Sequence, residues 1–414
     1  MIFWLLVAYG LVGAAYWLWM LWAGWQTAWK TPRLSRLSAP EPPTWPTLSI
    51  LIPACNEEDT LEPAVRRLLE EDYPELEIVL VNDRSTDRTG EFVDQLAAQD
   101  QRIRPMHIHQ LPDGWLGKVH ALWQGFQQSR GQWLLLMDAD VHLQRGTLRR
   151  IMAWAETERL DFLSAAPRIL ARGWLLRTAI TAFLRMFCAL MRVWAVSDPR
   201  STAFIGVGAF NLVRRSALER TEGFQWLRLE VADDVGLGLL MKRSGARCAF
   251  LLAPEGIQLE WYRSLREMAR GTEKAFASVA QCSPVRAAVI WLLSAVFELA
   301  PVVAAGAWIV WAIHPGDGAR ETYIQNILCG ALGAAELTLM LLGCLGSILL
   351  LHRTYREPIG PGLLFPLAVL LHGYFLLRAA WLGWRRGGIV WRGTLYPSAL
   401  LRAHQRVRFP EVLR

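Results

Sequence analysis

The chain has 414 residues, of which 53% are hydrophobic and 20% are charged, and its formal net charge is +7. Ordinary soluble domains are less apolar and more charged. The length and the high hydrophobic fraction together exclude disorder, collagen, a coiled coil and a small disulfide scaffold. It indicates a membrane protein with room for one sizeable soluble domain. The 21 tryptophans and the basic charge are typical of contact with lipid headgroups. Nucleic acid is not an expected partner, because no basic stretch is interleaved with aromatic residues outside the membrane flanks.

Residues 1–29 contain no charged side chain and are long enough for one membrane-spanning helix. They lack a basic n-region and a small-residue cleavage site, so we interpret them as an uncleaved anchor. A proline-rich linker over residues 30–46 follows. It begins with Lys30, Arg33 and Arg36, and this basic bias predicts that the next domain is cytoplasmic.

Strand-like and helix-like patterns alternate in the soluble region, residues 47–280. Short apolar runs predict strands at 48–53, 78–81 and 133–137. Helical periodicity predicts helices at 57–71 and about 89–99. This alternation predicts an α/β domain with an open, mainly parallel sheet, in which ligands bind beyond the carboxyl ends of the strands.

Polar clusters follow these three predicted strands. They contain Pro53, Asn56 and Glu57 after the first strand, Asp83 after the second, and Asp138 and Asp140 after the third. Mg²⁺ and Mn²⁺ prefer oxygen ligands, and such an ion often binds protein carboxylates and substrate phosphates together. The DxD at a strand end therefore predicts a divalent-cation site. A helix cap would also explain either aspartate of the DxD alone.

A family resemblance rests on four motifs in a fixed order. The chain contains IPACNEE, VNDRSTD, LLLMDAD and VADDVGLG, together with Gly114–Lys118 and Gly206–Arg215. Over residues 47–280 this pattern resembles the family 2 glycosyltransferases, which implies a GT-A fold with a Rossmann-like nucleotide-binding half. The anchor, the C-terminal apolar runs and Trp391-Arg392-Gly393-Thr394 are similar to the lipid-directed branch, which includes ceramide, carotenoid and hopanoid-associated enzymes.

The resemblance implies a role for each polar cluster. Asp83 would hydrogen-bond the uracil of a UDP-sugar, Asp138 would face the ribose, and Asp140 would ligate Mg²⁺ or Mn²⁺ on the diphosphate. Lys118 would help to bind the same region, although a solvated lysine is the alternative. The remaining nucleotide-sugar-binding candidates are Pro53, Asn56 and Glu57.

The acidic pair Asp233 and Asp234 matches the position of the family's catalytic base. Inversion at an anomeric carbon requires a carboxylate that takes the proton of the acceptor hydroxyl. The resemblance assigns this role to Asp234, with Asp233 assisting it. Two adjacent acids also suit the first turn of a helix, and both interpretations can hold together.

One family motif is altered. Processive synthases and ceramide enzymes carry (Q/R)xxRW, whereas this chain has Glu267 at the position of the tryptophan. This departure argues against a polymer-extending synthase. Arg266, Arg270 and Lys274 recur every four residues, which predicts three cations on one helical face. They would bind the diphosphate of the donor or anionic lipid headgroups.

Apolar runs at about 287–313, 324–351 and 359–384 predict a C-terminal membrane region over 287–384. Inside it, Glu298, Glu336 and His372 are either functional or hydrogen-bonded between helices. The arginine-rich tail, residues 385–414, predicts a cytoplasmic C-terminus, so we expect one of the three runs not to cross.

Residues 167–195 are apolar but carry a basic stripe of Arg177, Arg185 and Arg192 on one helical face. This pattern predicts a helix in the membrane interface, and a buried amphipathic helix of the soluble domain is the alternative.

The sequence thus predicts a multi-pass inner-membrane enzyme with a cytoplasmic catalytic domain. It would be an inverting glycosyltransferase that moves a sugar from a nucleotide-sugar to a terpenoid, carotenoid or sphingoid lipid. The alternatives are a polyprenyl-phosphate glycosyltransferase, a processive polysaccharide synthase, or a non-catalytic protein that binds lipid or nucleotide. The six cysteines form no CxxC pair, which predicts free thiols in a reducing compartment.

Overall fold

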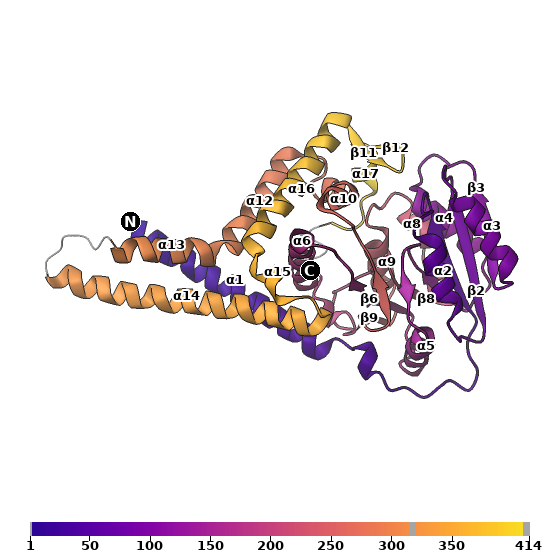
Figure 1. Cartoon of the computed structure of the whole chain (residues 1–414), viewed down its shortest axis with the longest axis horizontal. Coiled ribbons are helices and arrows are strands. Elements are labelled where there is room, and N and C mark those ends of the chain that lie inside the picture. Colours follow the sequence, from indigo (N-terminus) through magenta and orange to yellow (C-terminus); the bar gives the residue numbers. More distant parts are fainter. Residues whose placement is uncertain (1, 314–319, 409–414) are drawn as a thin grey trace. The chain divides into compact units, whose positions relative to one another are not determined.

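The computed structural model describes residues 2–313 and 320–408, and the chain forms two compact units (Figure 1). We call them the apolar unit and the sheet unit. The apolar unit comprises Met1–Trp29, Arg172–Ala189 and Ser264–Trp384, and the sheet unit comprises Lys30–Ala171, Leu190–Arg263 and Arg385–Arg414. These bounds differ from the prediction of one domain over 47–280, because residues 172–189 and 264–280 group with the apolar helices. The predicted basic tail belongs to the sheet unit.

The sheet unit is built on a seven-stranded sheet in the order β3-β2-β1-β4-β8-β6-β9 (Figure 1). Its strands are β1 Leu48–Ala54, β2 Leu76–Asp83, β3 Ile103–Ile108, β4 Trp133–Leu136, β6 Phe162–Ala166, β8 Asn211–Arg214 and β9 Cys248–Leu252. All described pairings in this sheet are parallel except those of β8 with β4 and β6. The predicted open, mainly parallel sheet is therefore confirmed.

Helices, a small second sheet and a two-stranded hairpin near the C-terminus complete this unit. The helices are α2 Leu61–Leu69, α3 Thr89–Gln99, α4 Gly117–Gln128, α5 Thr147–Thr157, α7 Arg215–Glu219, α8 Gly223–Leu227, α9 Asp233–Arg243 and α17 Ser398–His404. The small sheet consists of β5 His142–Leu143, β7 Arg168–Ile169 and β10 Ile257–Leu259. The helix predicted from residue 57 begins four residues later, because Asn56 is left-handed and residues 57–60 form a turn.

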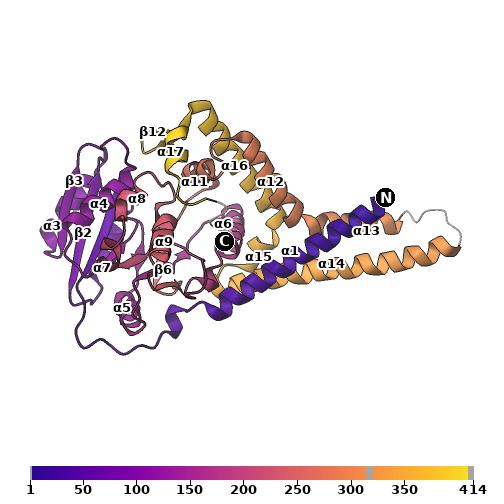
Figure 2. The same ribbon diagram turned by 180° about the vertical axis from the view of Figure 1, so that it is seen from behind.

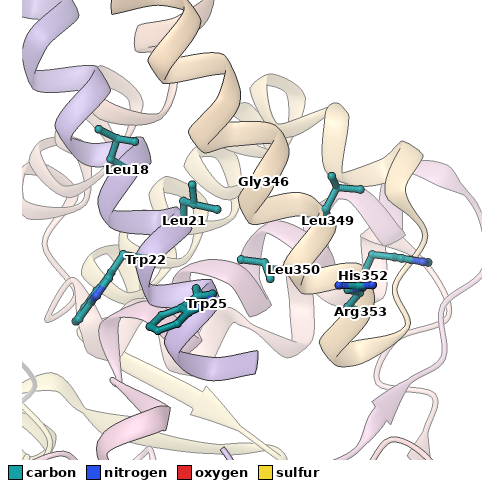
Figure 3. A pocket seen from close by; sticks show the side chains of 9 residues that line it. All are labelled: Leu18, Leu21, Trp22, Trp25, Gly346, Leu349, Leu350, His352 and Arg353. Atoms are coloured by element: carbon teal, nitrogen blue, oxygen red, sulfur yellow. The ribbon is translucent and has the colours of Figure 1, made fainter. Parts of the chain in front are cut away.

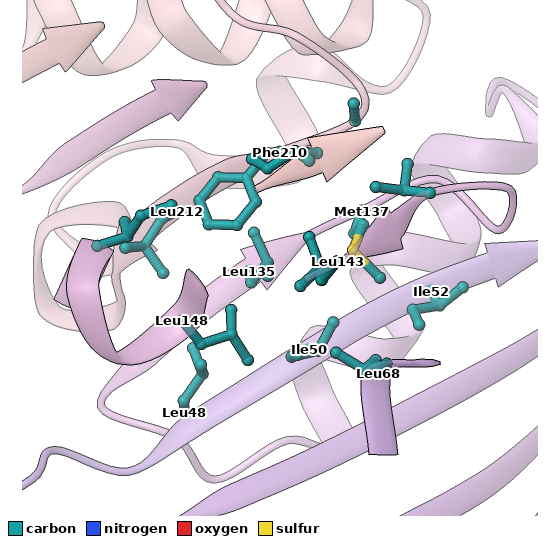
Figure 4. Close-up of a cluster of buried hydrophobic side chains, with 14 of the residues drawn as sticks. Leu48, Ile50, Ile52, Leu68, Leu135, Met137, Leu143, Leu148, Phe210 and Leu212 are labelled. Atoms are coloured by element: carbon teal, nitrogen blue, oxygen red, sulfur yellow. The ribbon is translucent and has the colours of Figure 1, made fainter. Parts of the chain in front are cut away.

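Both faces of the sheet are covered, which explains why its strands are continuous apolar runs. Side chains alternate along a strand, so Ile50 and Ile52 point to one face, where they pack with residues of α2, α3 and α5 (Figure 4). Leu51 points to the opposite face and approaches Gly125 of α4. Because no side chain lies at Gly125, α4 packs closely against β1 and β2.

The apolar unit consists of helices, seen from two sides in Figures 1 and 2. They are α1 Ile2–Lys30, α6 Trp174–Leu190, α10 Leu265–Gly271, α11 Glu273–Val279, α12 Pro284–Glu298, α13 Ala300–Ile313, α14 Arg320–Tyr355, α15 Ile359–Leu363 and α16 Phe365–Arg386. Among the described residues, four helices are long and apolar enough to cross a membrane, and five if the bent pair α11 and α12 counts as one span. The first predicted C-terminal run is interrupted at Leu299, between α12 and α13.

The three arginines of the predicted basic stripe lie in different environments, and the location of this helix in the membrane interface stays a prediction. Arg177 is exposed, and Arg192 follows the end of α6 in a left-handed conformation. Arg185 is buried, pairs with Glu298 and lies over the ring of Trp17. Arg185 thus faces the interior of the helix bundle and is paired with a carboxylate there, as is usual for charged side chains among membrane helices.

An apolar groove runs between α1 and α14 within this unit (Figure 3). Leu18, Leu21, Trp22 and Trp25 line one wall. The opposite wall consists of Gly346, Leu349, Leu350, His352 and Arg353. The groove has an apolar lining, and many leucine and tryptophan side chains of the unit are exposed. Both features are typical of helices that contact lipid.

Candidate functional site

The parallel strands β2, β1 and β4 are neighbours, so their carboxyl ends lie at the same edge of the sheet. This edge carries Asp83 at the end of β2, and Asp138 and Asp140 directly after β4. The helix α9 begins with Asp233 and Asp234. Ligands of open α/β sheets bind at such an edge, which makes these carboxylates the candidate site.

Lys118, in the first turn of α4, connects the DxD with the acidic pair. Its Nζ lies 2.6 Å from Asp138 Oδ1 and 3.6 Å from Asp233 Oδ2. Burial lowers the pKa of Lys118, but Asp138, Asp233 and Asp234 outweigh it, and the net pKa lies above the ordinary value. Lys118 is therefore a fixed cation among these carboxylates, and the alternative of a freely solvated lysine is wrong.

Asp234 is held by two backbone donors. The N–H of Gly208 donates to Asp234 Oδ2 and the N–H of Val235 donates to Oδ1, both at 2.8 Å. Gly206 is required beside them, because a Cβ there would lie 1.7 Å from the Asp234 carbonyl oxygen. Burial and the charge of Asp233 raise the pKa of Asp234 to about 6, against the opposing effect of Lys118. This carboxylate is oriented, and it is a stronger base than a solvated aspartate.

Asp140 lies in a site short of positive charge. Burial raises its pKa to about 7, and the nearby carboxylates of Asp138 and Glu57 add to the rise. Among residues 2–313 and 320–408, no group of three or more His, Cys, Asp or Glu side chains forms a metal-binding cluster. Mg²⁺ and Mn²⁺ at diphosphates use only one or two protein carboxylates, with substrate oxygens and water as the other ligands. Asp138 and Asp140 fit this kind of site.

Asp83 is buried and is bound by its neighbour Arg84. Arg84 Nε donates to Asp83 Oδ1 at 2.7 Å and Nη2 donates to Oδ2 at 3.0 Å. A Cβ at Gly117 would lie 2.4 Å from Arg84 Nη2 and 2.6 Å from Asp83 Oδ2, so a larger residue where α4 begins would displace this pair. The pair lies at the same edge of the sheet as the DxD.

The first polar cluster connects β1 to the loop after β2. Asn56 Oδ1 accepts from the N–H of Thr86 at 2.8 Å, and the N–H of Glu57 donates to Thr89 Oγ1 at 2.8 Å. Pro53 lies in β1 itself. Asn56 thus shapes this part of the site through the backbone of its neighbours.

Several residues at this edge were missing from the predicted site. Arg84 faces Asp83, Arg392 lies 2.6 Å from Glu57, and Tyr396 accepts a hydrogen bond from the N–H of Gly117. Glu230 accepts backbone hydrogen bonds from Arg406 and Val407. The motif Trp391-Arg392-Gly393-Thr394 marked one of these segments in the sequence, but only the fold shows what it contacts.

The predicted three-cation face is divided between two helices. Arg266 and Arg270 lie on α10 and Lys274 lies on α11, with Thr272 between the helices. Ser264 caps α10 by accepting from the N–H of Glu267 at 3.2 Å. Glu267 therefore lies in the first turn of α10, where an acidic side chain suits the helix dipole. Arg270 and Lys274 belong to the apolar unit, so their role toward a donor stays a prediction.

The comparison with protein families decides the identity of the sheet unit. Residues 49–247 match the model described as "Glycosyl transferase family 2". This part of the chain is a family 2 glycosyltransferase domain. The matched range begins within β1 and ends between α9 and β9. It contains every carboxylate of the candidate site.

Two curated relatives match a little over half of the chain. The probable glycosyltransferase YdaM of Bacillus subtilis is 29% identical over 55% of this chain and 56% of its own length. The beta-monoglucosyldiacylglycerol synthase of Synechocystis is 25% identical over 58% of this chain and 52% of its own length. The chain thus spans about half the length of each of these relatives.

A solved structure supports the fold. The mannosyltransferase PcManGT of Pyrobaculum calidifontis, determined with GDP-Man and Mn²⁺, superposes with a TM-score of 0.51 at 19% identity. The superposition covers 92% of this chain and 99% of that one. The predicted GT-A fold is therefore confirmed.

Proposed function

We propose that this glycosyltransferase transfers a sugar, with inversion, from a nucleotide-sugar to a hydrophobic lipid acceptor at a membrane. The observation that carries the proposal is the cluster of Lys118, Asp138, Asp140, Asp233 and Asp234 at one edge of the sheet. It combines an excess of negative charge, suited to a divalent cation, with one oriented carboxylate of raised pKa.

The residues of the cluster divide the chemical work. Asp234 takes the proton of the acceptor hydroxyl while the oxygen of that hydroxyl forms a bond to the anomeric carbon of the donor sugar. The bond from that carbon to the diphosphate breaks with its electron pair, and the charge on the leaving group is met by Lys118. Asp138 and Asp140 would hold Mg²⁺ or Mn²⁺, which supplies further neutralisation of the diphosphate. Direct displacement of this kind inverts the configuration.

The donor is proposed to be a UDP-sugar, with Asp83 binding the base. Asp83 is buried at the end of β2 with both oxygens engaged by Arg84, so the pair offers a fixed carboxylate and a guanidinium edge to a base. PcManGT was solved with GDP-Man and Mn²⁺, which supports a nucleotide-sugar and a divalent cation without deciding the base.

A lipid acceptor is supported by two observations. Four described helices are long and apolar enough to cross a membrane, and the Synechocystis relative is named as a synthase of a glucosylated diacylglycerol. The basic residues Lys30, Arg33 and Arg36 after α1 favour a cytoplasmic sheet unit at an inner membrane. The capped α10, with Glu267 in place of tryptophan, favours a single addition over chain extension.

The test is release of nucleoside diphosphate by purified protein in lipid nanodiscs. UDP-glucose, UDP-galactose, UDP-N-acetylglucosamine and GDP-mannose are supplied separately with Mn²⁺ and a membrane lipid extract, and the lipids are analysed by mass spectrometry. We expect one donor to give nucleotide release and a new glycolipid of matching mass. Nucleotide release without a lipid product would overturn the lipid acceptor. Asp234→Asn is the control for contaminating enzymes.

A further inference from the structure

A two-stranded hairpin near the C-terminus lies in the sheet unit. It consists of β11 Gly388–Trp391 and β12 Thr394–Pro397, which pair in antiparallel register with Trp391 opposite Thr394. The connecting residues Arg392 and Gly393 have φ angles of 48° and 79°. Two residues with positive φ form the tight turn that matches the twist of a hairpin. The turn places Arg392 at the tip of the hairpin, between the two strands in sequence.

The hairpin and the segment after it contact the candidate site at three places. Arg392 Nη2 lies 2.6 Å from Glu57 Oε1, and Nη1 donates to the carbonyl of Cys55. Tyr396 accepts from the N–H of Gly117, the residue before Lys118. Further along, the backbone N–H groups of Arg406 and Val407 donate to the buried carboxylate of Glu230. These contacts join the C-terminal segment to the loop after β1, to the start of α4 and to the loop before α9.

Arg392 differs from Lys118, the cation among the carboxylates of the DxD and the acidic pair. The Lys118 side chain is 20% exposed and is surrounded by carboxylates, whereas the Arg392 side chain is 43% exposed and has one carboxylate partner. Glu57, that partner, lies close to Asp140. A guanidinium forms paired hydrogen bonds with phosphate as readily as with carboxylate. Arg392 can therefore bind an anion at this edge without leaving a buried charge unpaired.

We propose that Arg392 is a donor-binding residue whose guanidinium binds the diphosphate of the nucleotide-sugar. The C-terminal hairpin is thus one wall of the donor site. The inference rests on the proposed function, since it assigns the diphosphate to the edge formed by Asp138 and Asp140. Glu57 holds the guanidinium in position before the donor arrives.

Binding affinities of Arg392→Gln test this role. The affinity of the nucleoside diphosphate that wild-type protein binds, UDP or GDP, is measured in nanodiscs with Mn²⁺, next to the affinity of the corresponding nucleoside. We expect Arg392→Gln to weaken diphosphate binding about tenfold or more, as for loss of a hydrogen bond to a charged group. Nucleoside binding should stay the same. Arg392→Lys should recover part of the loss, because it keeps the charge without the fork.

The matched control is Arg402→Gln, an exposed arginine of α17 in the same C-terminal segment. Its diphosphate affinity should equal that of wild-type protein. Unchanged diphosphate binding in Arg392→Gln would overturn the inference and leave the proposed function intact. An equal loss of nucleoside and diphosphate binding would also overturn it, because it would assign Arg392 to packing of the hairpin. Wild-type protein that binds neither UDP nor GDP would instead overturn the proposed function.

Discussion

Each unit of the molecule holds a cation against carboxylates, and the two clusters differ in balance and in access. In the sheet unit, one lysine lies among Asp138, Asp233 and Asp234, and the Asp138 side chain is 40% exposed. In the apolar unit, Arg185 pairs with Glu298, and their side chains are 5% and 8% exposed. The first cluster has excess negative charge and an opening to solvent, whereas the second is balanced and closed.

This difference separates a binding site from a structural pair. Excess buried charge is costly unless a further cation arrives, so we propose that the first cluster binds a metal together with a diphosphate. A balanced pair has no such need, and Ser294 donates a further hydrogen bond to Glu298 at 3.0 Å. Substitutions that change one cluster at a time test this difference between the two clusters.

Asp234→Asn should have the largest effect on turnover. Removal of a general base lowers transfer by about 10²–10⁴-fold, and nucleotide binding should be nearly unchanged. Asp233→Asn should cost less, because the Asp234 carboxylate remains. Steady-state rates and nucleotide affinity are measured together. Asp113→Asn, an exposed aspartate of the same unit, is the control and should be fully active. Near-normal turnover in Asp234→Asn would remove it from the role of base.

Glu298→Gln should act on stability instead. Removing one partner of a buried pair leaves Arg185 uncompensated and destabilises by about 3–5 kcal/mol. Thermal unfolding in detergent should show a clear decrease, with nucleotide affinity retained in the folded fraction. Glu336→Gln is the control, because Glu336 Oε2 has no hydrogen-bond partner among the described residues. Equal stability of Glu298→Gln and wild-type protein would contradict the structural role of the pair.

Asp140→Asn should remove the metal dependence of nucleotide binding. We expect the affinity for UDP in Mn²⁺ to fall about tenfold or more, since a contact to a charged group is lost. The variant should bind UDP equally with Mn²⁺ and with a chelator. Calorimetric titration with and without Mn²⁺ measures both quantities. A persisting Mn²⁺ effect would assign the metal to other residues.

The pH dependence should be the smallest effect within the working range. The pKa of Asp234 is raised to about 6, and its deprotonated form is the proposed base. Transfer should therefore rise with pH through about 6 and fall roughly tenfold for each unit below it. The stability of the fold should change with pH in the opposite direction to the transfer rate. A carboxyl group whose pKa is raised on folding stabilises the fold in its protonated form. Without metal, the stability contribution of Asp140 should be lost as pH rises toward its pKa of about 7.

A pH-rate profile of wild-type protein and Asp234→Asn separates these effects. The acidic limb should be present in wild-type protein and absent from the residual rate of the variant. Unfolding scans at pH 5 and 8 should show that Mn²⁺ stabilises more at the higher pH. An acidic limb that persists in Asp234→Asn would assign the titration to another group.

The sequence predicted the features that depend on local pattern. Apolar strands ending in Asp83, Asp138 and Asp140 were recognisable because strand and turn lie next to each other in the chain. The acidic pair at the start of α9 was recognisable from its match to the family motif in VADDVGLG. Helix α3 was predicted with its observed ends, 89–99, because its apolar residues follow a clear helical period.

Contacts between distant segments were not predictable. Arg392 and Glu57 are 335 positions apart, and Arg185 and Glu298 are 113 apart, so neither pair leaves a local pattern. The break at Leu299 lies inside a continuous apolar run, and its available signal was Pro301, near the first position of α13. The division of residues 47–280 between two units likewise depends on packing, because α6 is apolar enough for either unit.

The central claim is that the edge carrying Asp138 and Asp140 binds a metal-bound nucleoside diphosphate. A structure of the protein with UDP and Mn²⁺, with anomalous scattering of manganese to locate the metal, tests it most directly. We predict a manganese peak beside Asp138 and Asp140, shared with diphosphate oxygens. UDP bound with manganese located elsewhere, or bound away from the carboxyl ends of β1, β2 and β4, would contradict the account.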